Sequence, residues 1–237
     1  MTEAAACAGE KACNAIAWNG KTIEARCLTA RELNDCYLPL RYDVLRRELN
    51  WTIGNVIEPA DLRDAYERDS IAFGIFTTGA QLIGAARLIV AAPGTDVPTV
   101  RLLRSLGRQT RLRLPVAEIS RVMVREDCRR LGLFPILLLS GLLLAESAEV
   151  RTLILSERDD ARSARMMANY GFIRFADGFA FVDELIAPEE PAATYVLDLC
   201  FDPETRQTIA ARRQALMRTA DGLFATNPRS KLASSQT

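Results

Sequence analysis

The chain has 237 residues, of which 49% are hydrophobic and 25% charged, enough for one globular domain with a full apolar core. Its 30 basic residues balance its 30 acidic ones, so no net field attracts nucleic acid or an anionic membrane surface. Histidine is absent, which excludes Ser-His-Asp and Cys-His catalysis and His-containing zinc sites, and we expect no metal centre.

Cysteine usage and the lack of a long apolar segment predict a cytoplasmic protein. The six cysteines are scattered without a CxxC pair, as is typical of reduced thiols. The alanine-rich start lacks a basic region followed by a long apolar core, so no secretory signal is expected. The most apolar stretch, 134–147, is shorter than the ~20 residues of a bilayer crossing, so it predicts a buried helix and no membrane span.

The chain opens with a predicted tail and a β-hairpin. Residues 1–14 show no periodicity, and we expect them to be flexible. Short apolar runs at 15–18 and 22–28 flank Asn19-Gly20, a pair typical of two-residue hairpin turns. The globular domain is therefore expected to begin at residue 15 and to extend to residue 201.

A long helix and a polar loop are predicted next. Thr29 is the predicted N-cap, with Glu32 in the capping-box position. Apolar residues at helical spacing then predict a helix over 30–49, with a bend expected at Pro39. The following stretch, 52–69, is polar and acidic and longer than a simple connection needs, which is typical of a lid or a binding loop.

Two strands and a short helix lead to the centre of the chain. Apolar runs at 71–77 and 81–90 predict strands, and the second contains Arg87, a charge inside an apolar strand. The stretch 100–106 predicts a helix within a run of arginines. This run is either a solvated basic face or a docking surface for an acidic carrier protein.

The apolar run over 116–124 has the composition of a buried strand, yet it contains Glu118, Ser120 and Arg121. Burying a carboxylate and a guanidinium is unfavourable unless they are paired or functional, so this strand is the first place to look for a site. In a regular strand Glu118 and Arg121 point to opposite faces, whereas a bulge near Ile119 or Ser120 can re-aim one of them. The alternative is a structural buried ion pair.

Helices and strands alternate in the C-terminal half. The predicted buried helix is followed by a strand, a helix closed by Gly171, and two further strands. These elements are expected at 152–155, 159–170, 172–182 and 194–199, before a C-terminal helix at 202–225 and a flexible tail at 226–237.

This order of elements resembles the GNAT acyltransferase fold and implies an α/β (α+β) domain, with a mixed central sheet in a three-layer α-β-α arrangement. In that family the turn after the fourth strand binds the pyrophosphate of coenzyme A at a helix N-terminus. Arg129 and Gly132 match this donor-binding turn, whereas Phe134 stands where a small residue is usual. The resemblance implies acyl carrier protein or acyl-CoA as donor, and Tyr170 as the acid that reaches the thiolate leaving group.

A more specific resemblance covers about 40–124 and is to the acyl-homoserine-lactone (autoinducer) synthases of the same superfamily. Arg41 and Trp51 keep the family's spacing, although the aromatic residue between them is not kept. The family's acidic pair corresponds either to Asp61 with Asp64 or to Asp64 with Glu67. The resemblance implies substrate-binding roles for these residues, with the Trp51 ring over a cationic acceptor.

Two strand motifs complete this resemblance. A glycine-x-x-arginine strand matches Gly84 and Arg87, and a glutamate-x-serine-arginine strand matches Glu118, Ser120 and Arg121. N-acyl amino acid synthases and exosortase-associated acyltransferases, which acylate other amines, share much of the pattern. A GNAT-like domain that only binds is a third reading.

In the lactone synthases, the amine of S-adenosylmethionine attacks the thioester of a fatty acyl donor, and the carboxylate then displaces methylthioadenosine to close the ring. The resemblance implies that Glu118 takes the amine proton, since the chain has no histidine. Arg41, Asp64, Arg87 and Arg121 would form an ionic network over the pocket. S-adenosylmethionine and the acyl thioester enter as substrates, so no cofactor is expected.

Overall fold

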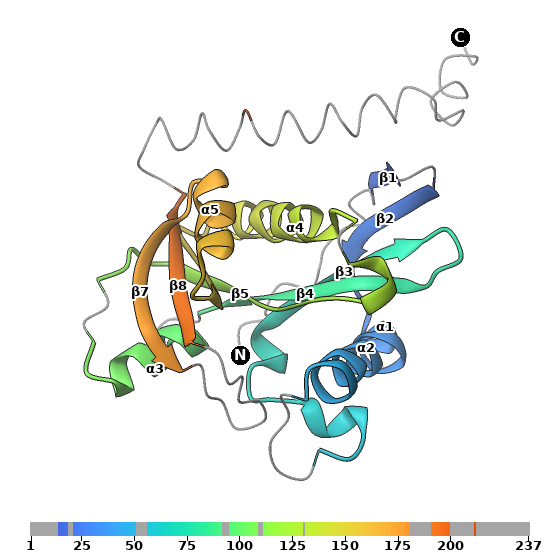
Figure 1. Cartoon of the computed structure of the whole chain (residues 1–237), viewed down its shortest axis with the longest axis horizontal. Coiled ribbons are helices and arrows are strands. Elements are labelled where there is room, and N and C mark those ends of the chain that lie inside the picture. Colours follow the sequence, from blue (N-terminus) through green and yellow to red (C-terminus); the bar gives the residue numbers. More distant parts are fainter. Residues whose placement is uncertain are drawn as a thin grey trace.

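The computed structural model describes residues 14–18, 21–50, 56–91, 95–108, 111–129, 131–180 and 191–199, together with Ala211. Across these residues the chain forms one mixed sheet with helices on both faces (Figure 1). The strands are β1 (Asn14–Trp18), β2 (Lys21–Cys27), β3 (Ser70–Thr77), β4 (Leu82–Val90), β5 (Val116–Val124), β6 (Thr152–Arg158), β7 (Ile173–Ala180) and β8 (Pro191–Asp198). Apart from Asn14 and Ala211, the two predicted tails and the predicted C-terminal helix lie outside the described residues.

The sheet has the strand order β1-β2-β3-β4-β5-β6-β8-β7. Its pairs are antiparallel except at the centre, where β5 and β6 run parallel. These two strands pair up to Ile119 and Leu155, and residues 120–124 and 156–158 beyond them form no pairs with each other. We call this point the β5–β6 split. Ile119, the last β5 residue that pairs with β6, directly follows Glu118.

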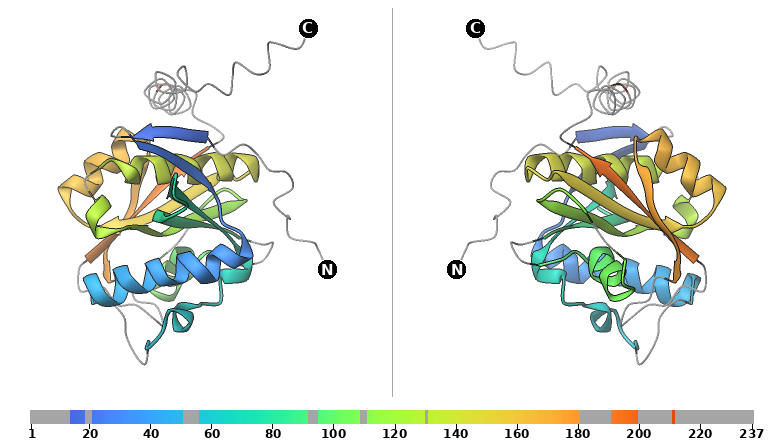
Figure 2. Two further views of the ribbon diagram at one scale, coloured as in Figure 1. Left: turned by 90° about the vertical axis from the view of Figure 1, so that its right-hand side faces the viewer. Right: turned by 90° about the vertical axis from the view of Figure 1, so that its left-hand side faces the viewer.

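Helices form a layer on each face of the sheet (Figure 2). One face carries α4 (Leu133–Ser147) and α5 (Ala161–Asn169), and the other carries the N-terminal helical stretch and α3 (Pro98–Ser105). The N-terminal stretch consists of α1 (Ala30–Glu32), a π-helical turn (Leu33–Tyr37), α2 (Leu38–Tyr42) and a second π-helical turn (Asp43–Glu48). The predicted helix over 30–49 therefore forms, and it begins with the predicted capping box.

The main core lies between the sheet and α4. This helix is apolar on all sides, and its residues pack with the inward-facing residues of β3 to β6. Gly141 lets α4 approach the sheet closely, because a Cβ there would lie 2.6 Å from Cδ1 of Ile119. Within the described residues no helix is long and apolar enough to cross a membrane. The predicted buried helix is thus confirmed as a core helix.

The loop before β3 differs from its predicted form. Where a polar loop over 52–69 is predicted, the described part contains two 3-10 turns, Pro59–Leu62 and Glu67–Asp69. Leu62 is fully buried, with 0% of its surface exposed, and it packs with Leu45 and Val56. Burial of this apolar side chain anchors the acidic loop against the N-terminal helix.

Candidate active site

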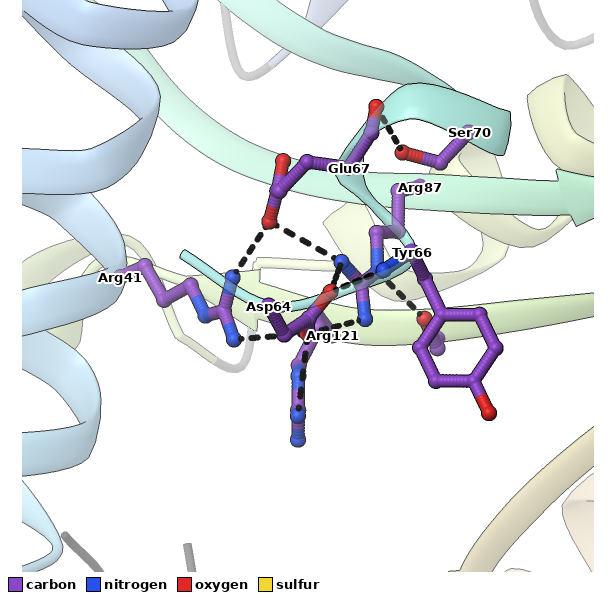
Figure 3. A network of polar contacts seen from close by, with 8 residues as sticks. Arg41, Asp64, Tyr66, Glu67, Ser70, Arg87 and Arg121 are labelled. Carbon is purple, nitrogen blue, oxygen red and sulfur yellow. Dashed lines mark hydrogen bonds and ion pairs between the residues drawn. The ribbon is translucent and has the colours of Figure 1, made fainter. Parts of the chain in front are cut away.

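Of the described residues, three arginines from different elements converge on two carboxylates of the loop before β3 (Figure 3). Arg87 binds both oxygens of Asp64, with Nη1 2.8 Å from Oδ1 and Nη2 2.6 Å from Oδ2. Arg41 donates to Oε1 of Glu67 at 2.9 Å and to Asp64 at 3.3 Å. Arg121 lies 3.5 Å from Asp64. The predicted ionic network is therefore present and includes Glu67; we call it the arginine–carboxylate network.

Burial decides how strongly the network is held. Arg41 and Arg87 are 0% and 1% exposed, and buried charges are unfavourable unless well paired. Burial raises the pKa of Asp64, but the hydrogen bonds and charge of Arg87 outweigh this and hold it well below its usual range. Burial lowers the pKa of Arg87, and the hydrogen bonds to Asp64 reverse that shift. Three guanidinium groups and two carboxylates thus meet in this network.

A β-bulge brings Arg121 into this network. Between Ser120 and Met123, β5 has one more residue than the facing stretch of β4, and Arg121 has a positive φ of 53°. A non-glycine residue adopts that conformation at a cost of about 1–2 kcal/mol. The bulge lies one or two residues later than predicted. As a result Arg121 points toward Asp64, on the side where the Ser120 hydroxyl accepts from Nε of Arg87 at 2.9 Å.

Glu118 lies directly before the β5–β6 split and faces α3. It is 1% exposed, and its Oε2 accepts the backbone N–H of Thr99 at 2.8 Å. The Thr99 hydroxyl is 3.0 Å from that of Ser156, which is 3.2 Å from that of Thr194. Burial raises the pKa of Glu118 to about 7, although the hydrogen bonds from Thr99 and the charge of Arg87 lower it. Such a carboxyl can take up and release a proton near neutral pH.

The predicted donor-binding turn joins β5 to α4. Arg129 donates from Nε to the carbonyl of Val124 at 3.1 Å and also binds Glu48 at the end of the N-terminal helical stretch. Gly132 is the N-cap of α4 with a φ of 80°, and no side chain caps the helix. Phe134 packs partly against the main core. The first amides of α4 are therefore left to stabilise an anion.

Other predicted site residues lie apart from the network. Asp61 is exposed and caps a 3-10 turn, which leaves Asp64 and Glu67 as the acidic pair that meets the arginines. Tyr170 follows α5 and packs against the main core on the opposite face of the sheet. Trp51 lies outside the described residues. In the described part of the chain, no group of three or more His, Cys, Asp or Glu side chains is placed to hold a metal ion.

The sequence does not reveal Thr99, the hydrogen-bond partner of the predicted base, or Ser156, which contacts Thr99. Thr99 contributes a backbone N–H at the start of α3, which any non-proline residue could supply. Pro98 at the first helical position is the signal that a helix with free N–H groups begins there. Nothing in the sequence distinguishes Ser156 from other strand residues. Its contact with Thr99 depends on how α3 packs on the sheet.

The strand order, the parallel pair at the split and the helix layers define the GNAT acyltransferase fold. Solved structures with this fold include MesI, a CoA-dependent acyl-homoserine lactone synthase. It is 16% identical over 79% of this chain and 94% of its own, with a TM-score of 0.56. BjaI, a CoA-dependent acyl-homoserine lactone synthase solved with MTA, is 17% identical over 79% of this chain and 87% of its own, with a TM-score of 0.54.

FeeM, an N-acyl amino acid synthase from uncultured soil microbes, is 17% identical over 78% of this chain and 94% of its own, with a TM-score of 0.53. Identities this low establish a shared fold, and a shared fold hosts many activities. No protein-family model and no curated protein sequence matches the chain. The fold alone therefore does not define the function, and the side chains of the site have to.

Proposed function

We propose that this chain is an N-acyltransferase that moves a fatty acyl group from a thioester donor to the amine of S-adenosylmethionine. Closure of the product to an N-acyl-homoserine lactone then releases methylthioadenosine. The observation that carries the proposal is Glu118, a buried carboxyl with a pKa of about 7 beside the β5–β6 split. The acyl-homoserine lactone synthases MesI and BjaI, which share the fold, add support.

The acyl-transfer step needs a base, because a protonated amine has no lone pair with which to attack. Glu118 takes that proton, the nitrogen bonds to the thioester carbonyl carbon, and the carbon–sulfur bond breaks. The carbonyl oxygen carries negative charge in the intermediate and needs hydrogen-bond donors. Backbone amides of β5 beyond Ile119, which do not pair with β6, are suited to supply them.

The acceptor must carry the group that the network recognises. The three arginines gathered at Asp64 are suited to an acceptor with a carboxylate beside its amine. S-adenosylmethionine fits this description, but so does a free amino acid, and the fold shared with FeeM favours that second candidate. The remaining alternatives are the exosortase-associated type, which acylates another amine, and a domain that binds without turnover.

One assay separates these candidates. The protein is incubated with a fatty acyl thioester and either S-adenosylmethionine or a panel of amino acids, while released thiol and methylthioadenosine are measured separately. Our proposal predicts both products with S-adenosylmethionine. Thiol release with an amino acid and none with S-adenosylmethionine would support an N-acyl amino acid synthase. No release with any acceptor would contradict both enzymes.

We further propose acyl carrier protein as the preferred donor carrier. Arg129 of the donor-binding turn already pairs with Glu48, whose negative charge opposes the pyrophosphate of coenzyme A. We expect kcat/KM to be higher for acyl carrier protein than for acyl-CoA of the same chain length. Glu48→Gln should raise kcat/KM for acyl-CoA more than for the carrier protein. A clear preference of the unmodified protein for acyl-CoA would contradict the proposal.

A further inference from the structure

A second ionisable carboxyl, Glu157, lies on the opposite face of the sheet from Glu118. Along β6 the side chain of Leu155 packs in the main core under α4, whereas Ser156 faces α3. Because side chains alternate along a strand, Glu157 faces α4 and α5. Its partner on β8, Ala193, belongs to the same main core.

Glu157 is also placed close to the β5–β6 split. It lies two positions beyond Leu155, the last β6 residue that pairs with β5, which is about 7 Å along the strand. The helix α4 packs across β2 to β5, and α5 packs on β7, so β6 and β8 lie between the strands that the two helices cover. Glu118 and Glu157 therefore flank the same split, one on each face of the sheet.

Polar groups on this part of β6 and β8 lack partners. Among the described residues, Glu157 makes no hydrogen bond or ion pair although it is partly buried. The hydroxyl of Tyr195, a residue that is 2% exposed, has no hydrogen-bond partner either. Tyr195 pairs with Leu155 and is thus the diagonal neighbour of Glu157 on the same face. Buried polar groups are normally satisfied, so the unpartnered Tyr195 hydroxyl beside the half-buried Glu157 indicates a place for a polar reacting group.

We propose that Glu157 is the general acid of the acyl transfer, which protonates the departing sulfur while Glu118 accepts the proton of the amine. This inference rests on the proposed acyl-transfer function. The carbon–nitrogen bond forms, the carbon–sulfur bond breaks, and the thiolate takes the proton of Glu157 to leave as a thiol. Glu118 ends protonated and Glu157 ionised, and exchange with solvent restores both.

The direction of donor entry explains why the acid belongs on this face. The predicted donor-binding turn lies at the start of α4, so the arm that carries the thioester reaches the split from the α4 side. A thiol has an ordinary pKa of about 8.5, so a leaving thiolate gains from protonation near neutral pH. Tyr170, the acid that the family resemblance implies, lies at the far end of α5, whereas Glu157 precedes the start of that helix.

Burial also tunes Glu157 for this task. It raises the pKa of Glu157 to about 7, while the charge of Arg158 lowers it and that of Asp160 raises it. A carboxyl with this pKa remains partly protonated at neutral pH and is still acidic enough to protonate a thiolate. The other ionisable groups near it are Tyr195 on β8 and the ion pair of Asp159 with Arg174.

The test compares Glu157→Gln with the control Glu149→Gln, which changes an exposed carboxylate after α4. Two donors with the same acyl chain are used, an alkyl thioester of pantetheine and an ester of a more acidic aryl thiol. With the pantetheine donor we expect Glu157→Gln to lower kcat/KM by about 10²–10⁴-fold. With the aryl donor the loss should nearly vanish, because an acidic thiolate leaves without a proton.

The pH profile gives a second readout. In the unmodified protein kcat/KM for the pantetheine donor should fall above about pH 7, and that alkaline limb should be absent in Glu157→Gln and with the aryl donor. Equal losses with both donors, or a retained alkaline limb, would overturn the role of Glu157. If Glu157→Gln does not fold, the unmodified protein with the two donors still decides the question. No acyl transfer to any amine with either donor would instead refute the proposed function.

Discussion

The two faces of the central strands are stabilised in different ways. On the α4 side, Ile119 and its neighbours pack in an apolar core, where attraction is non-directional and tolerates small shifts. On the opposite side, Glu118 and Ser120 face hydrogen-bond partners whose strength depends on distance and angle. The strand β5 supplies both the apolar and the polar side chains, because successive side chains along a strand point to opposite faces of the sheet. The apolar face therefore fixes the backbone on which the charged face can hold a strained bulge.

The largest expected effect on stability comes from breaking the arginine–carboxylate network. Arg87→Ala removes the bidentate partner of Asp64 and leaves this mostly buried carboxylate only its longer contacts with Arg41 and Arg121. Breaking a buried pair costs about 3–5 kcal/mol. Urea unfolding should show a loss of that size. The exposed pair of Arg125 with Asp127 provides the control, and Arg125→Ala should cost only about 0–1 kcal/mol.

A double mutant sharpens this prediction. Removing Asp64 as well as Arg87 eliminates the carboxylate that has lost its main partner. The loss of stability in the double mutant should therefore be smaller than the sum of the losses in the two single mutants. The double mutant should still be less stable than the unmodified protein, because Arg41 loses its contact with Asp64. Additivity within about 0.3–0.5 kcal/mol would show that the two residues do not share a network.

The second effect depends on pH. In the folded state the pKa of Glu118 is raised from 4.5 to about 7, so the folded protein binds the proton more tightly than the unfolded chain. The cost of burying the charge is absent below about pH 4.5, grows as pH rises to about 7, and then stays constant at about 3 kcal/mol. Glu118→Gln removes it. The unfolding free energy of the variant minus that of the unmodified protein, measured in urea, should therefore be larger at pH 8 than at pH 5. A difference that does not change with pH would show that Glu118 is not buried in its charged form.

The smallest effect tests the apolar face. Gly141→Ala places a methyl group 2.6 Å from Cδ1 and 3.0 Å from Cγ1 of Ile119, and such overpacking costs about 1–3 kcal/mol. The higher helix propensity of alanine returns about 1 kcal/mol, so we expect a net loss of about 1 kcal/mol. Ser140→Ala, at the adjacent partly buried position, should change the unfolding free energy by less than about 0.5 kcal/mol. A Gly141→Ala protein with a higher unfolding free energy than the unmodified protein would show that α4 is not in close contact with β5 at this position.

The elements that the sequence predicts well are those with local signals. The capping box of Thr29 and Glu32 and the apolar run of β5 depend on neighbours in the chain, and both form where predicted. The position of the bulge depends on how β5 pairs with β4, which is not a local property. The choice of Glu67 over Asp61 likewise requires knowing which side of the loop meets the arginines.

The central claim is that Glu118 is the base for the attacking amine, and its replacement by glutamine tests it most directly. The amide keeps the size of the side chain but cannot accept the proton, so turnover should fall by about 10²–10⁴-fold. Glu149→Gln should leave turnover unchanged, and the greater stability of Glu118→Gln at pH 8 would show that it is folded. If Glu118 is the base, a folded Glu118→Gln protein should lose acyl transfer. An unchanged kcat in the same assay would contradict it.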